Sequence, residues 1–173
     1  MITTELIKQL RDETGVSVMQ CKKALEEVGG DIEKARIVLK KKSGAAAEKK
    51  ADRELGAGFL VVNTQGDTSA LITLLCETDF VAKNEEFVNA AKKVAEMAVT
   101  EGEAVKQSSA EMINELIQKM GENIKVGEVK VMKGNVGSYV HNGLIGAVVA
   151  LKDKNDDLAR DIAMHITAMK PAF

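Results

Sequence analysis

The chain has 173 residues, of which 45% are hydrophobic and 29% charged, and its formal net charge is −2. This length allows one ordinary domain, or a small domain joined to a medium one, and the composition is that of a globular protein. The N-terminus lacks the basic stretch and apolar run of a signal peptide. The longest apolar run, GLIGAVVAL, is about half of what a membrane-spanning helix needs. We therefore expect a cytoplasmic chain without a membrane partner.

The charge distribution argues against a nucleic-acid-binding surface. Residues 1–56 carry 12 basic and 10 acidic side chains, so neither part of the chain is strongly basic. The lysines at 40–42 and 49–50 favour solvated helix faces, with RNA contact as the alternative. The two cysteines, Cys21 and Cys76, form neither a metal motif nor a disulfide framework.

Residues 1–42 predict three short amphipathic helices. Thr3 or Thr4 can cap the first, Ser17 begins an S-x-x-Q capping box for the second, and Asp31 can cap the third. The expected apolar stripe of the second helix includes Val18, Cys21, Leu25 and Val28. So small a bundle has no room for a catalytic pocket and is typical of a docking module. Residues 43–56 follow as a charged, partly helical linker.

Strand patterns begin after the linker. FLVVN and SALITLLC predict two strands around a TQGD turn, and Asn84 can cap the helix that follows. Ser108 begins an S-x-x-E pattern that predicts a cap for a further helix, and Gly121 can end that helix.

The pattern of strand, turn, strand and helix then repeats. SYVH and LIGAVVAL flank Asn142-Gly143, a strong hairpin signal, and a last helix is expected to turn His165 inward. We predict an α+β fold: a small N-terminal three-helix bundle, then a core of antiparallel strands with helices on the sheet, built from two related halves. The halves are expected at 57–122 and 123–173.

Motifs for enzymatic chemistry are absent from the sequence. It contains no phosphate-binding glycine loop, no H-E-x-x-H and no G-x-S-x-G. The acidic residues Glu77, Asp79, Glu85 and Glu86 match no metal-binding loop, and the last two suit a helix N-terminus. We expect no cofactor, no metal site and no enzymatic activity.

Two residues leave an open choice between structural and functional roles. Phe80, one of four phenylalanines, lies in the polar connection TDFVAK, whereas the matching connection KDKN of the second half has no aromatic residue. Its ring either plugs the strand end or is presented to a partner, with Asp79 as a neighbouring acceptor. His141 lies beside the Asn-Gly turn, where chance surface placement and partner contact are equally compatible with the sequence.

Several segments carry a resemblance to a known family. TGVSVMQCKKALEEVGGDIEKA and CETDFVAKNEEF resemble the two signatures of bacterial elongation factor Ts, and KMGENIKV, GSYVHNGLIG and IAMHITAMKP match further segments in the same order. The resemblance implies a factor that exchanges GDP for GTP on elongation factor Tu. It also implies that residues 1–42 form a ubiquitin-associated-like domain that docks on the G domain of Tu.

The same resemblance implies the roles of individual residues. Asp79 and Phe80 would enter between helices of the G domain, and Thr78 to Val81 would dislodge Mg²⁺ so that GDP leaves. The remaining expected contacts with Tu are Lys22, Met120, Gly121 and His141. Longer members continue past Lys170-Pro171, so we expect the C-terminal half to be a short form or a fragment, and self-association stays open. The alternative is an adaptor that docks through the N-terminal bundle without causing nucleotide exchange.

Overall fold

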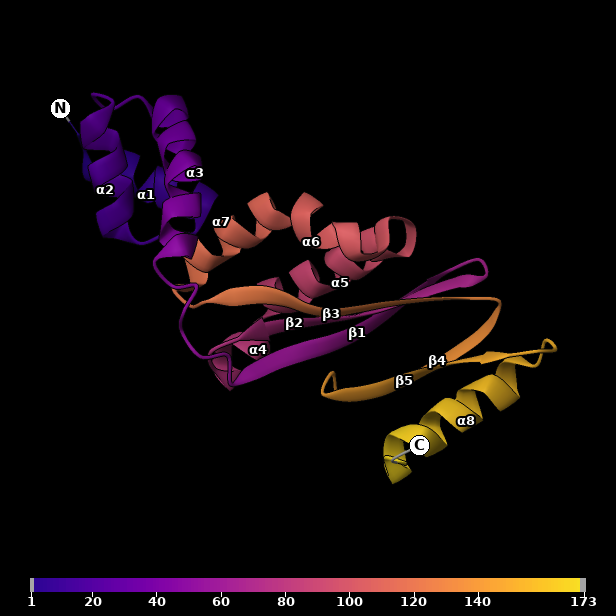
Figure 1. The fold of residues 1–173 in the computed structure, drawn as a ribbon. Helices are drawn as coiled ribbons and strands as arrows, with labels where there is room; N and C mark the ends of the chain where they lie inside the picture. The colour runs from indigo at the N-terminus through magenta and orange to yellow at the C-terminus, as the bar shows by residue number, and fades with distance from the viewer. Residues whose placement is uncertain (1, 172–173) are drawn as a thin grey trace. The chain divides into compact units, whose positions relative to one another are not determined.

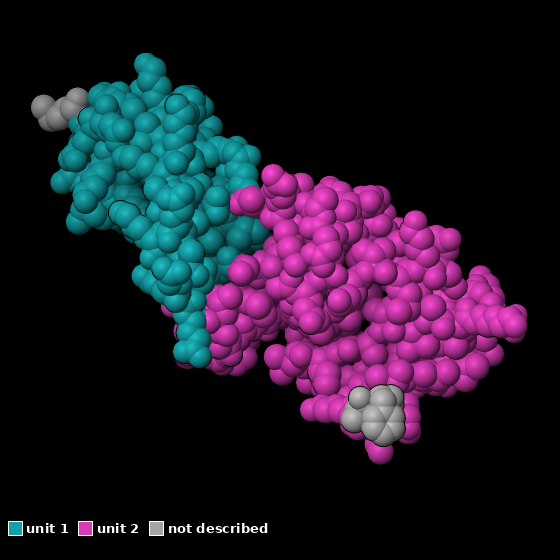
Figure 2. Space-filling view, in the orientation of Figure 1, with its two compact units in different colours: residues 1–54, 111–124 teal, residues 55–110, 125–173 magenta. Residues whose placement is uncertain are grey.

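The computed structural model describes residues 2–171. The chain forms two compact units, one comprising residues 1–54 and 111–124 and the other residues 55–110 and 125–173 (Figure 2). The structure thus groups residues 111–124 with the N-terminal residues, whereas the expected division places them in the core. The expected division into a docking domain, a linker and two core halves stays a prediction.

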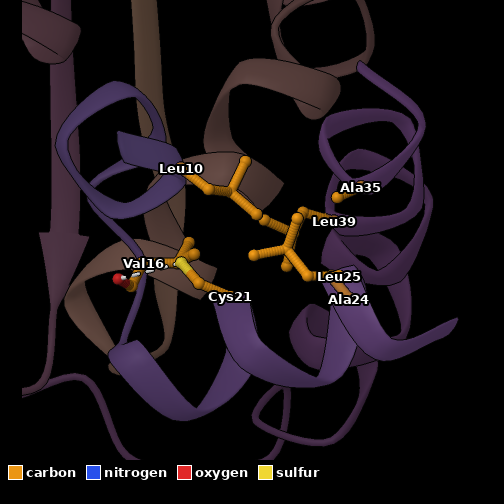
Figure 3. Close-up of a cluster of buried hydrophobic side chains, with 7 residues drawn as sticks. All are labelled: Leu10, Val16, Cys21, Ala24, Leu25, Ala35 and Leu39. Atoms are coloured by element: carbon orange, nitrogen blue, oxygen red, sulfur yellow. Dashed lines mark hydrogen bonds between the residues drawn. The ribbon is translucent and has the colours of Figure 1, made fainter. Parts of the chain in front are cut away.

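The first unit contains helices α1 (Thr4–Thr14), α2 (Val18–Glu27) and α3 (Ile32–Glu48), together with most of α7 (Ala110–Met120). The predicted caps are present, because Thr3, Ser17 and Asp31 each accept a hydrogen bond from a backbone N–H of the first helical turn. The three N-terminal helices pack around a buried apolar cluster (Figure 3) of Leu10, Val16, Cys21, Ala24, Leu25, Ala35 and Leu39. Helix α3 continues to Glu48, so the first part of the expected linker is helical.

The second unit begins with the hairpin of β1 (Ala57–Gln65) and β2 (Thr68–Cys76), which pair antiparallel from Ala57↔Cys76 to Gln65↔Thr68. Strand β3 (Ile124–Lys133) adds to β2, giving the sheet order β1-β2-β3. Helix α5 (Glu85–Glu101) packs on β1 and β2 (Figure 1) and buries Phe87, Ala91 and Val94 against them. Asn84 caps α5 as predicted. Short helices, η1 (Gly102–Ala104) and α6 (Val105–Ser108), lead on to α7.

A second hairpin follows, made of β4 (Asn135–His141) and β5 (Ile145–Leu151), which pair antiparallel as a separate two-stranded sheet. Helix α8 (Asp156–Met169), capped by Asn155, packs on both strands (Figure 1). Antiparallel sheets covered by helices confirm the predicted α+β class. Within residues 2–171, no helix is long and apolar enough to cross a bilayer.

Three local predictions are wrong. The buried face of α8 consists of Ala159, Ala163 and Thr167, whereas the expected inward residue His165 is exposed. Val18 is 52% exposed, because the buried face of α2 consists of Cys21, Ala24 and Leu25. Ser108 does not precede its helix as a cap: it is the last residue of α6, and its hydroxyl donates to the Glu101 carboxylate.

Candidate partner-binding site

The segment from Thr78 to Val81 forms a single helical turn directly after β2. Thr78 has extended backbone angles and its hydroxyl accepts a hydrogen bond from the Val81 N–H, so it is the N-cap of α4 (Asp79–Ala82). The buried thiol of Cys76 donates to the Thr78 carbonyl across 3.2 Å. Ala82, only 7% exposed, fixes the other end of the turn in the core. Both ends of this segment are therefore held by buried residues.

Phe80 projects from this anchored turn into solvent. Its side chain is 84% exposed, whereas Phe87, at the start of α5, is completely buried. The contrast excludes the interpretation of Phe80 as a local plug beneath the strand end. Burying a phenylalanine side chain contributes about 1.5–3 kcal/mol. The exposed ring of Phe80 can therefore contribute this free energy when another molecule covers it.

Asp79 lies beside this ring and is engaged by a lysine one turn later. The Lys83 ammonium donates to the Asp79 carboxylate over 2.6 Å, and both side chains are largely exposed. This hydrogen bond, together with the attraction of the lysine charge, lowers the pKa of Asp79 below its ordinary value. The carboxylate is thus ionised and accessible at neutral pH.

His141 lies at the tip of the β4–β5 hairpin. Its Nδ1 shares a hydrogen bond of 3.1 Å with the Tyr139 hydroxyl. The turn itself uses Asn142 and Gly143 with positive φ angles of 53° and 70°, as the sequence predicted. His141 is exposed and is held in place by its own strand.

The hairpin tip and α4 lie toward the same end of β1. The Leu60 N–H donates to the Gly143 carbonyl across 2.6 Å, which attaches the tip to β1. Leu60 is three residues from Ala57, whose partner Cys76 lies two residues before Thr78. Three strand residues span about 10 Å, so the second unit brings His141 and the Thr78–Val81 segment into one region.

The other predicted contact residues lie in the first unit. Lys22 is exposed on α2 and pairs with Glu26 at 3.8 Å. Met120 ends α7, and Gly121 follows with a φ of 79° while its N–H donates to the Ile117 carbonyl at 2.9 Å. Gly121 therefore terminates α7, as predicted, in a conformation that glycine adopts without strain.

Exposed apolar side chains add residues that the sequence analysis did not single out as contacts. Met19 is 63% exposed and lies next to Val18 at the start of α2, one turn before Lys22. Leu144 is 74% exposed in the turn beside His141. The sequence signal for Leu144 is its place directly after the Asn-Gly pair, where a side chain has no opposite strand to cover it.

Metal-ligating side chains do not gather in the described part of the chain. Between residues 2 and 171, no group of three or more His, Cys, Asp or Glu side chains is arranged to hold an ion. The side chains exposed in this region are the ring of Phe80, the carboxylate of Asp79 and the imidazole of His141.

Comparison with known proteins identifies the family. The family model described as "Elongation factor TS" matches residues 77–173, which include the α4 segment and the β4–β5 hairpin. Elongation factor Ts of Arthrospira platensis is 43% identical over 98% of this chain and 75% of its own length. The chain belongs to the elongation factor Ts family.

Further members of the elongation factor Ts family are similarly close. Elongation factor Ts of Psychrobacter sp. (strain PRwf-1) is 41% identical over 98% of this chain, and that of Aeromonas hydrophila subsp. hydrophila is 40% identical over 99%. The chain spans 62% and 63% of the lengths of these two relatives, so less than two thirds of each.

Proposed function

We propose that this chain is a translation elongation factor that binds elongation factor Tu in its GDP form and promotes exchange of GDP for GTP. The observation that carries this proposal is the exposed ring of Phe80 on an anchored turn, within the segment that matches the family. A factor of this kind performs no covalent chemistry, so it needs neither a phosphate loop nor a nucleophile of its own.

In the proposed mechanism, Phe80 and Asp79 enter between helices of the G domain of Tu. The ring separates packed side chains there, and the Asp79 carboxylate accepts hydrogen bonds from the displaced segment. Because Thr78 and Ala82 hold both ends of the turn, the ring can displace groups of the partner instead of folding back onto its own core. Mg²⁺ and then GDP leave the partner as its phosphate-binding elements shift.

Thermodynamic linkage constrains this mechanism. The factor must bind nucleotide-free Tu more tightly than GDP-bound Tu, because only a difference in affinity shifts an equilibrium. GDP must then weaken the binding of the factor to Tu by the same ratio. GTP rebinding releases the factor and completes the exchange.

The remaining predicted contacts enlarge this interface. We assign Lys22, Met120, Gly121 and His141 to further contact with Tu, and we propose that residues 1–42 act as a ubiquitin-associated-like docking domain. We also propose that the two hairpin–helix arrangements, β1–β2 with α5 and β4–β5 with α8, are the related halves of the core. A recurring arrangement of two strands and a covering helix supports this relationship.

The test is release of fluorescent GDP from Tu, measured by stopped flow with and without the factor. Truncation of an aromatic hot spot costs about 2–4 kcal/mol, so Phe80→Ala should reduce the acceleration by at least about 30-fold. Asp79→Ala should also reduce it. Met164→Ala removes another exposed apolar side chain, on α8, and should leave the rate unchanged. Wild-type rates for both Phe80→Ala and Asp79→Ala would contradict the wedge mechanism.

A non-exchanging adaptor is the second candidate, and the exposed pair Val18 and Met19 on α2 favours it. An adaptor would bind Tu through this surface while leaving the GDP off-rate unchanged. Binding of Tu abolished by Met19→Ser, together with an unaltered off-rate for the wild-type factor, would support the adaptor. The same stopped-flow assay thus separates the two functions.

RNA binding through the lysines near residue 40 receives less support. The Lys40 ammonium pairs with Glu111 and Glu115, and Lys42 pairs with Glu27. Side chains already paired with carboxylates contribute little to a phosphate-binding surface.

A further inference from the structure

The tip of the β4–β5 hairpin carries a large apolar side chain that the contacts assigned above do not use. Leu144 is 74% exposed, and among the large apolar side chains of residues 2–171 only Phe80 is more exposed. A single leucine on a surface is ordinary in itself. Its meaning therefore depends on how it is held and on what lies beside it.

The hairpin tip is attached to β1 through the residue that precedes Leu144. The Leu60 N–H donates to the Gly143 carbonyl across 2.6 Å. Gly143 is buried, and a Cβ atom at this position would overlap the ring of Phe59. The glycine backbone thus lies directly against the ring, and the tip is fixed to the second unit.

The turn also orders the backbone of Leu144 itself. Its N–H donates to the His141 carbonyl across 3.0 Å, which closes the turn. A side chain on an ordered backbone loses less conformational entropy on binding than one on a flexible loop. More of the free energy gained by covering Leu144 is therefore available as affinity for a partner.

Strand β1 places this leucine close to the Phe80 turn. Leu60 holds the tip, and Ala57, three residues earlier, pairs with Cys76 at the end of β2. Figure 1 shows the β4–β5 turn and α4 at the same end of β1. The two most exposed large apolar side chains of the described residues thus lie in one region, so a partner that covers Phe80 can also cover Leu144.

The two side chains suit different tasks. Insertion of the Phe80 ring costs free energy, because packed side chains of the partner must separate, and contacts elsewhere in the interface have to offset that cost. Leu144 is flanked by the polar residues His141 and Asn142, so its apolar contact is confined to one side chain. Such a contact fits a shallow apolar hollow on a surface, without separation of packed helices.

We propose that Leu144 is a second apolar anchor for elongation factor Tu, bound in a shallow apolar hollow about 10 Å from the place that receives Phe80. This proposal rests on the proposed exchange function and divides its work between two residues. Phe80 displaces the elements that hold GDP, whereas Leu144 holds the factor on Tu with or without nucleotide. A contact made equally in both states raises affinity but leaves the rate at saturation unchanged.

The test measures GDP release from Tu over a range of factor concentrations, which separates the half-saturating concentration from the maximal rate. Leu144→Ala should raise the half-saturating concentration about tenfold without changing the maximal rate, as expected when most of a covered apolar side chain is removed. Phe80→Ala should instead lower the maximal rate. Leu144→Met stays apolar and should remain within about twofold of wild type. The matched control Leu158→Ala removes an exposed leucine from α8 and should change neither quantity.

Calorimetric titration of Tu, with and without GDP, separates this proposal from the exchange function. Leu144→Ala should weaken binding about tenfold in both nucleotide states. A wild-type chain that binds Tu without speeding GDP release would contradict the exchange function, and the same titration would still decide the role of Leu144. Unchanged affinity of Leu144→Ala, a lowered maximal rate in that variant, or failure of the wild-type chain to bind Tu would each overturn the anchor. Unchanged affinity together with a wild-type dimer that Leu144→Ala dissociates would assign this side chain to self-association.

Discussion

At the scale of single residues, Phe80 and Phe87 are close in sequence but opposite in solvent exposure. Phe87 lies on the apolar face of α5 and is fully buried, whereas Phe80 lies in a polar turn and is 84% exposed. The sequence indicated that Phe80 was unusual, because the second hairpin–helix connection has no aromatic residue. It did not decide between a plug and a presented ring, because that choice depends on how Cys76 and Ala82 orient the turn.

The carboxylate beside Phe80 gives a pH prediction. The Lys83 hydrogen bond lowers the pKa of Asp79 from an ordinary value of 3.8, so Lys83→Gln should raise that pKa toward 3.8. The stabilisation from this pair is present at pH values above the unfolded-state pKa and is lost as pH falls through the lowered one. An NMR titration of the Asp79 side-chain carbon between pH 2 and about pH 6 measures the change.

A matched control for this titration is Lys93→Gln. It removes an exposed lysine from α5 while leaving the Asp79–Lys83 hydrogen bond intact, so the Asp79 titration curve should not move. An unchanged pKa of Asp79 in Lys83→Gln would show that the ion pair does not persist in solution.

At the scale of elements, helix starts were the most predictable feature. Thr3, Ser17, Asp31 and Asn84 each cap a helix as the sequence indicated, because capping depends on local contacts within one turn. Ser108 has the same local pattern, but the chain is already helical there and its hydroxyl donates to Glu101. The capping pattern at Ser108 was therefore misleading, because the residues before it already form helix α6.

The buried face of a helix was less predictable than the residues at which the helix begins and ends. In α8 the large residues Leu158 and Met169 are exposed, while small residues, Ala159 and Ala163, face the sheet. The reason is close approach: a Cβ atom at Gly137 of β4 would lie 2.5 Å from the Ala159 Cβ. Periodicity favours large side chains for the core, but here the helix lies too near the strand to admit them.

This close approach predicts the effect of one methyl group. Gly137→Ala would force α8 away from β4, because the new atom would also lie 2.7 Å from the Ala159 carbonyl carbon. We expect a loss of about 1–3 kcal/mol in the free energy of unfolding, measured by urea denaturation. Gly44→Ala in helix α3 is the matched control, since the nearest atom to its Cβ would be Asn114 Nδ2 at 4.0 Å. That variant should stabilise the chain by up to about 1 kcal/mol.

At the scale of the whole molecule, the α+β class followed from the strand and helix patterns, but the composition of the units did not. Residues 111–124 join the N-terminal helices because their contacts are with that unit. Lys40 pairs with Glu111 and Glu115, and the Asn123 amide donates to the carbonyls of Ala51 and Arg53. Such contacts between distant residues leave no periodic signal in the sequence.

The Asn123 contacts predict the stability of the first unit. Asn123 is 5% exposed, and its Nδ2 donates across 3.3 Å to Ala51 and 2.9 Å to Arg53. Asn123→Ala removes both hydrogen bonds and should lower the free energy of unfolding by about 1–3 kcal/mol, as expected for two hydrogen bonds. Urea denaturation measures the loss, with the exposed Asn89→Ala on α5 expected to stay within about 0.5 kcal/mol of wild type. Equal stability of the two variants would contradict this role.

The first unit is built from two separate segments of the chain, which affects how it folds during synthesis. A ribosome that has released residues 1–54 has supplied α1 to α3, but Glu111, Glu115 and Asn123 emerge only after the whole of 55–110 has been translated. The nascent helices must therefore wait for a later stretch of polypeptide before Lys40, Ala51 and Arg53 gain these partners. Translation speed between codons 55 and 124 thus sets how long that early intermediate persists.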